Sequence, residues 1–69
     1  MSKTAARNQD TAEATKLGAA AFVAGIVRAP AVDHAINAML VGRTSKDQCR
    51  LMTAWLSGWT RASLAAVAS

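Results

Sequence analysis

A chain of 69 residues, with eight basic and four acidic residues and one cysteine, makes one small domain. One cysteine forms no intramolecular disulfide, and with a single histidine it supplies too few ligands for a structural zinc site. A chain of this length buries only about 60% of its unfolded surface, so we expect a second copy or another partner to complete the core, most simply as a homodimer. The formal charge of +4 favours an anionic partner.

The composition predicts an all-α protein, because the chain is rich in alanine and has one proline, four glycines and no tyrosine. Its longest uncharged run after the N-terminus, residues 17–27, is shorter than the roughly 20 residues of a membrane span. No signal peptide is visible. We therefore expect a cytoplasmic protein without a membrane span.

Residues 1–9 are polar and are predicted to be disordered, which leaves residues 10–69 as one helical domain. Asp10-Thr11-Ala12-Glu13 is typical of a capping box and predicts a first helix over residues 10–28, ended by Pro30. Arg28 would then lie at the negative end of the helix dipole. Small residues recur four apart on this helix, and they favour either burial inside the monomer or a dimer seam: Ala14 and Gly18, then Ala21 and Gly25.

A second helix is predicted over residues 31–41, where apolar residues follow a one-sided helical pattern, and Gly42 is the expected left-handed residue after it. Ser45-Lys46-Asp47-Gln48 is typical of a second capping box and opens a third helix over residues 45–67. The second and third helices make a helix-loop-helix core, to which the first helix is added.

The third helix separates apolar and basic side chains onto opposite faces. Met52, Trp55, Leu56, Trp59 and Ala66 form the apolar ridge. The predicted core or dimer interface comprises Phe22, Ile26, Met39, Met52, Trp55, Leu56 and Trp59. The predicted nucleic-acid-binding strip comprises Arg43, Lys46, Arg50 and Arg61, with the small Ala54 and Ser57 leaving that face open. The strip is either a phosphate-binding surface or merely the solvated side of the helix.

The tryptophans are interpreted as core residues, with a stacking platform for unpaired bases as the alternative. His34 is expected to be exposed near a helix start, and Cys49 to be a small buried hydrophobe. No phosphate-cradling glycine loop, carboxylate pair or metal cluster is present in the sequence, so we predict no catalytic site, metal, cofactor or small-molecule substrate.

Two segments carry a resemblance to a known family: Ala38-Met39-Leu40-Val41-Gly42-Arg43 up to Cys49, and Trp55-Leu56-Ser57-Gly58-Trp59-Thr60-Arg61-Ala62. They resemble the bacterial ribosome modulation factor family, which also includes a small plasmid-borne protein linked to fluoroquinolone resistance. The resemblance covers about residues 34–63, and the first helix has no counterpart in the short family members. It implies a helix-loop-helix that binds the small ribosomal subunit and its RNA through Arg43, Lys46 and Arg50.

Three functions from different classes follow. The first is a ribosome or ribosomal-RNA binder that uses the basic strip. The second is a phage- or plasmid-encoded inhibitor or adaptor that binds one host protein through its apolar helical surface. The third and weakest is a drug-modifying enzyme, suggested only by the resistance-linked relative. Binding that collapses with salt indicates the first, and a salt-tolerant complex with one protein indicates the second.

Overall fold

The computed structural model describes the backbone of residues 3–68 and the side chains of residues 9–68. These residues form three α-helices and one 3₁₀ turn, in the order α1 (Lys3–Val23), η1 (Pro30–Val32), α2 (His34–Leu40) and α3 (Ser45–Ala68). No strand occurs in this range, which confirms the all-helical class.

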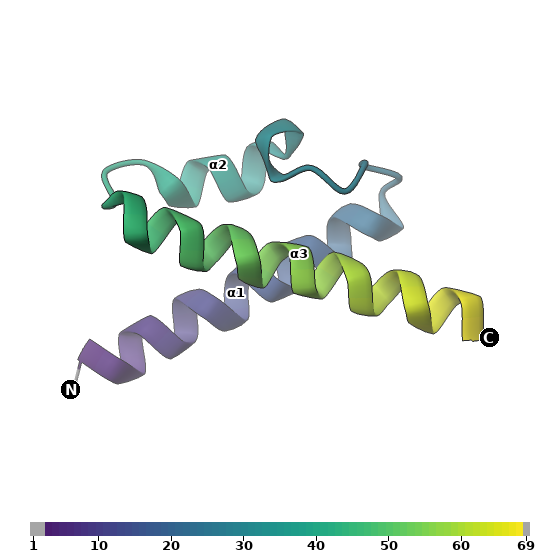
Figure 1. Cartoon of the computed structure of the whole chain (residues 1–69), viewed down its shortest axis with the longest axis horizontal. Coiled ribbons are helices and arrows are strands. Elements are labelled where there is room, and N and C mark those ends of the chain that lie inside the picture. The colour runs from purple at the N-terminus through teal and green to yellow at the C-terminus, as the bar shows by residue number, and fades with distance from the viewer. Residues whose placement is uncertain (1–2, 69) are drawn as a thin grey trace.

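Helices α1 and α3 run in the same general direction and cross each other, while the chain between them returns through η1 and α2 along α3 (Figure 1). The molecule is elongated, measuring 39 × 23 × 15 Å. At the crossing, the backbones of the two helices are in contact. A Cβ atom on Gly18 would overlap with the backbone of Trp55, and one on Gly58 would overlap with the backbone of Thr15. The small face of α1 is therefore buried inside the monomer by α3.

Three large side chains are completely buried between the helices: Ile36, Leu51 and Trp55. Alanines at positions 14, 21 and 54 complete the core, and a ring of half-buried apolar residues packs around it: Leu17, Ile26, Met39, Leu40, Leu56 and Trp59. Phe22 and Trp59 meet edge to face with 5.2 Å between ring centroids. The prediction that Trp55 belongs to the core is confirmed, and Met52 is half-buried.

The face of α3 predicted to be open is only partly so, because Ser57 is exposed whereas Ala54 belongs to the core. Ala54 lies on the arginine side of the helix and is buried, as is Leu51, which was not included in the predicted ridge. Small side chains at this point let α1 approach closely, and close approach excludes water as effectively as a large apolar side chain does. Two residues of the apolar ridge pack on the other side: Trp55 donates a hydrogen bond to Asp33 between η1 and α2, and Trp59 donates one to Ile26 after α1.

Helix α1 begins at Lys3, so the prediction of disorder over residues 1–9 is wrong for residues 3–9, while residues 1–2 lie outside the described range. The predicted capping box is wrong for the same reason, since Asp10 lies within the helix. Asp10 forms an ion pair with Arg43 instead.

Helix α1 ends at Val23 and not at residue 28, because Gly25 adopts a left-handed conformation with φ of 83°. The amide of Ile26 donates to the carbonyl of Ala21 at 2.9 Å, and the amide of Gly25 donates to the carbonyl of Phe22 at 3.0 Å. These two bonds make a Schellman motif, which closes a helix. Arg28 therefore lies outside α1, and Pro30 opens η1.

The predicted second helix is divided into η1 and α2, with Asp33 as the N-cap of α2. Gly42 has a φ of 78°, which confirms its predicted left-handed conformation after this helix. Helix α3 starts at Ser45 as predicted, but its cap is Thr44, whose hydroxyl accepts from the amide of Asp47 at 3.2 Å. The helix cap thus lies one residue before the predicted one.

Candidate functional site

Arg43, the first residue of the predicted basic strip, is engaged inside the chain. Its guanidinium lies 3.1 Å from the carboxylate of Asp10 on α1 and 3.4 Å from that of Asp47 on α3. Its Nε donates to the carbonyl of Met39 at 2.6 Å. Only 27% of the side chain is exposed. Arg43 therefore joins α1, the end of α2 and the start of α3.

Arg50 is engaged in the same cluster. Its Nη2 lies 3.1 Å from Oδ1 of Asp47, and its Nη1 donates to the hydroxyl of Thr11 on α1. The hydrogen bond from Arg50, followed by its charge and by the contacts with Arg43, lowers the pKa of Asp47 despite partial desolvation. Phosphate binding by Arg43 and Arg50 therefore stays a prediction, and both guanidinium groups are already engaged with acidic side chains inside the chain. The other two residues of the predicted basic strip, Lys46 and Arg61, are exposed.

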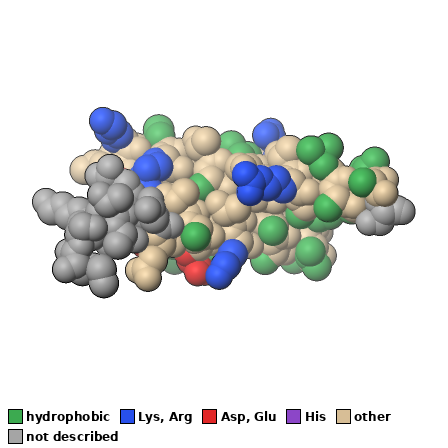
Figure 2. All heavy atoms as spheres, turned by 90° about the horizontal axis from the view of Figure 1, so that it is seen from below, with side chains coloured by type: hydrophobic (Ala, Val, Ile, Leu, Met, Phe, Trp, Pro, Cys, Tyr) green, Lys and Arg blue, Asp and Glu red, His purple; other side chains and the backbone are tan. Residues whose placement is uncertain are grey.

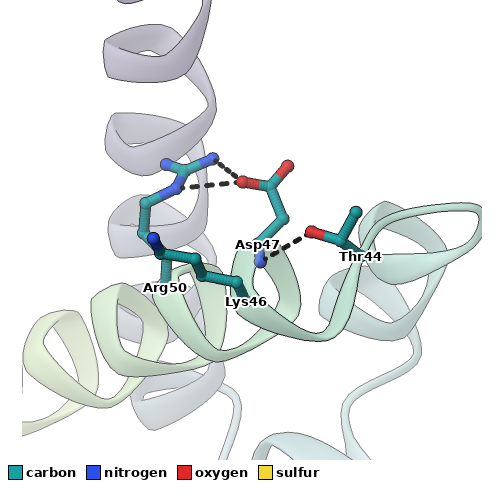
Figure 3. A pocket seen from close by; sticks show the side chains of 4 residues that line it. All are labelled: Thr44, Lys46, Asp47 and Arg50. Atoms are coloured by element: carbon teal, nitrogen blue, oxygen red, sulfur yellow. Dashed lines mark hydrogen bonds and ion pairs between the residues drawn. The ribbon is translucent and has the colours of Figure 1, made fainter.

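A shallow pocket of about 270 Å³ opens beside this cluster at the start of α3, lined by Thr44, Lys46, Asp47 and Arg50 (Figure 3). The carboxylate of Asp47 points toward the guanidinium of Arg50 in this pocket (Figure 3). The pocket therefore presents a mixed charge, because an acidic side chain lines it together with the two cations.

Asp33 is a buried residue whose role the sequence analysis missed. Its Oδ1 accepts from the amide of Ala35 at 3.1 Å, and its Oδ2 accepts from the indole Nε1 of Trp55 at 2.6 Å. The indole of Trp59 donates to the carbonyl of Ile26 at 2.9 Å. Both indole N–H groups thus form hydrogen bonds inside the fold, which favours the interpretation of the tryptophans as core residues over that of a base-stacking platform. An aspartate one residue before a helix, together with a tryptophan that needs a partner, was the available signal.

His34 is exposed, as predicted. Cys49 is also exposed, so the prediction that it is a buried hydrophobe is wrong. Among the described residues, no group of three or more His, Cys, Asp or Glu side chains could hold a metal ion. None of the described helices combines the length and apolarity required to cross a membrane.

One end of the molecule exposes large aliphatic side chains, and we call it the apolar end. It comprises Val23 (82% exposed), Val27 (63%), Leu64 (64%) and Val67 (83%). Val23 and Val27 flank the turn at Gly25, and the other two lie in the last two turns of α3.

Three contacts hold the turn against α3. Phe22 packs on Trp59, the indole of Trp59 donates to the carbonyl of Ile26, and Nε of Arg28 donates to the hydroxyl of Thr60 at 3.1 Å. Figure 2 shows hydrophobic side chains gathered where α3 extends beyond the crossing, whereas Lys and Arg side chains are scattered over the rest of that face.

Comparison with known proteins adds no relative: no protein-family model, curated protein or solved structure matches this chain. The resemblance to the ribosome modulation factor family therefore stays a prediction that rests on the residues quoted for it.

Proposed function

We propose that this protein is a non-enzymatic regulatory module that binds another protein through its apolar end. The observation that carries the proposal is the exposure of four large aliphatic residues at one end: Val23, Val27, Leu64 and Val67. Large apolar side chains that gather at one exposed place are typical of an interaction surface, whereas the exposed Val32 and Val41 lie elsewhere. The proposal agrees with the inhibitor or adaptor function expected from the sequence.

The shape of the chain supports the same proposal. Its accessible surface is 4676 Å², whereas a compact monomer of 7.2 kDa exposes about 4100 Å². The excess is consistent with the last turns of α3, which extend past the crossing and expose every residue from Leu64 to Ala68 (Figure 1). Covering this helical surface would supply part of the stabilisation that so small a core lacks.

Binding to the ribosome and its RNA, as in ribosome modulation factors, is the second candidate. The net charge of +4 and the exposure of Lys46 and Arg61 favour it. It ranks second because Arg43 and Arg50 are engaged with Asp10, Asp47 and Thr11. Two exposed cations neutralise few phosphates, and RNA affinity depends on that number.

A capture experiment with two double variants separates these functions. Tagged wild type, Leu64→Ser with Val67→Ser, and Lys46→Ala with Arg61→Ala are used to capture partners from bacterial lysate at about 100 and about 500 mM salt, a range over which phosphate contacts weaken steeply. We expect one stoichiometric protein at both salts, lost only in the Leu64 and Val67 variant. Ribosomal subunits captured at low salt only, and lost only in the Lys46 and Arg61 variant, would instead establish the second candidate.

A further inference from the structure

The charges around the apolar end have one sign. Within residues 17–32 the only charged residue is Arg28, and within residues 51–68 the only one is Arg61. The four acidic residues lie elsewhere. Asp10 and Asp47 belong to the ion-pair cluster at the start of α3, Asp33 is buried against Trp55, and Glu13 lies on α1 before the crossing. Among the described residues, the charged side chains that border the apolar end are thus both arginines.

Both arginines border the aliphatic surface directly. The hydrogen bond from Arg28 to Thr60 holds its guanidinium beside α3, one helical turn before Leu64. Arg61 follows Thr60 in the chain and is exposed. Leu64 and Val67 are spaced three apart, so they lie on one side of α3, and the alanines around them are small enough to let another helix come close.

From this arrangement we infer that the partner segment is an acidic amphipathic helix, whose aliphatic residues cover the apolar end while its Asp or Glu side chains pair with Arg28 and Arg61. The inference rests on the proposed protein-binding function and adds the chemistry of the partner. Aliphatic residues spaced by one turn are the usual anchors when a helix docks on an apolar surface. Charges at the rim of such a surface select the partner and accelerate association.

The same charges disfavour other occupants. A second copy of the chain would bring two pairs of arginines together around one patch, and like charges that face each other oppose association. Lipid binding usually needs an amphipathic helix with many basic residues on its polar face, and α3 has only Arg61 beyond the crossing.

The inference is tested by fluorescence anisotropy with the full chain and three labelled peptides. The peptides are amphipathic helices of about 18 residues, long enough to form helix on binding, with one shared aliphatic face and flanks of Glu, Gln or Lys. At about 50 mM salt we expect the Glu peptide to bind about two- to thirty-fold more tightly than the Gln peptide, as two exposed ion pairs allow. The Lys peptide should bind most weakly.

Charge reversal supplies the decisive variants. Arg61→Glu alone should weaken the preference for the Glu peptide, and Arg28→Glu with Arg61→Glu should make the Lys peptide bind most tightly. The matched control, Lys16→Glu with Lys46→Glu, changes the net charge equally but away from the apolar end, so the order of the peptides should remain that of the wild type. Circular dichroism checks that each variant is folded.

Each other outcome overturns the inference in a distinguishable way. Equal binding of the three peptides, lost in the variant Leu64→Ser with Val67→Ser, rejects the charge selection and leaves the docking surface intact. Failure of all three peptides rejects the inference. If sedimentation then shows a dimer that the same variant dissociates, the occupant is a second copy. If vesicles of anionic lipid bind instead, the occupant is a membrane surface.

Discussion

The indole Nε1 of Trp55 donates to the carboxylate of Asp33 at 2.6 Å, and this bond joins the middle of α3 to the start of α2. Asp33 is 7% exposed, and its other carboxylate oxygen caps α2 through the amide of Ala35. One side chain therefore satisfies a buried donor on one helix and an orphan amide on another.

Replacing Asp33 with alanine should destabilise the protein by about 2–4 kcal/mol. The change removes a helix cap, which contributes about 1 kcal/mol, and leaves the buried indole of Trp55 unpaired, which costs about 1–3 kcal/mol. Urea unfolding followed by tryptophan fluorescence measures the loss. Asp33→Asn is the control, since its amide oxygen keeps one of the two bonds. Equal stability of wild type and Asp33→Ala would contradict this role.

Gly58→Ala should destabilise the protein although alanine is the better helix former. The added methyl group overlaps with the backbone of Thr15, so α1 and α3 must move apart, and overpacking of this kind costs about 1–3 kcal/mol. Thermal unfolding by circular dichroism tests it, with Ser57→Ala on the exposed side of α3 as the matched control. A higher melting temperature for Gly58→Ala would show that the helices do not touch at this point.

Asp47 should make stability depend on pH in the acid range. Its pKa is lowered by the hydrogen bond from Arg50 and by Arg43, so the folded state favours the ionised carboxylate. That stabilisation is complete above the pKa of the unfolded chain, about 3.9, and is lost as pH falls through the lower folded pKa. Urea midpoints of wild type and Asp47→Asn should therefore differ at neutral pH, and the difference should shrink as pH falls below the unfolded pKa of about 3.9. A difference that stays constant with pH would exclude the ion pairs as its source.

The thiol of Cys49 should react in the folded protein. It is exposed on α3, so an aromatic disulfide reagent should label it completely under native conditions without loss of helicity. Labelling followed by absorbance, with circular dichroism of the product, tests this expectation. Reaction only in denaturant would restore the interpretation of Cys49 as a core residue.

Local sequence signals predicted part of this fold well. Gly42 and Trp55 behave as expected, and the start of α3 is correct, because each depends on neighbouring residues or on a single large side chain. The predicted end of α1 is wrong because it rests on Pro30 as the helix breaker, whereas Gly25 closes the helix earlier through a Schellman motif.

The candidate site was harder to predict because its partners are distant in the chain. Asp10 and Thr11 reach Arg43 and Arg50 across the helix crossing, and no periodicity encodes such pairs. The helical periodicity of α3 places the arginines opposite the apolar ridge. It does not indicate that Ala54 and Gly58, on the arginine side, are small enough for α1 to approach closely. The small volume of these two residues is what lets α1 pack on this side of α3.

The parallel crossing of α1 and α3 also determines when this chain can fold. Helix α1 packs mainly against α3, and Thr11 and Arg50, which meet across the junction, are 39 residues apart. During synthesis the small face of α1 therefore has no partner until most of α3 has been made. The entropic cost of closing a loop of this length is incurred before the packing contacts can stabilise the fold. The first helix of the fold is therefore buried by the last helix in chain order.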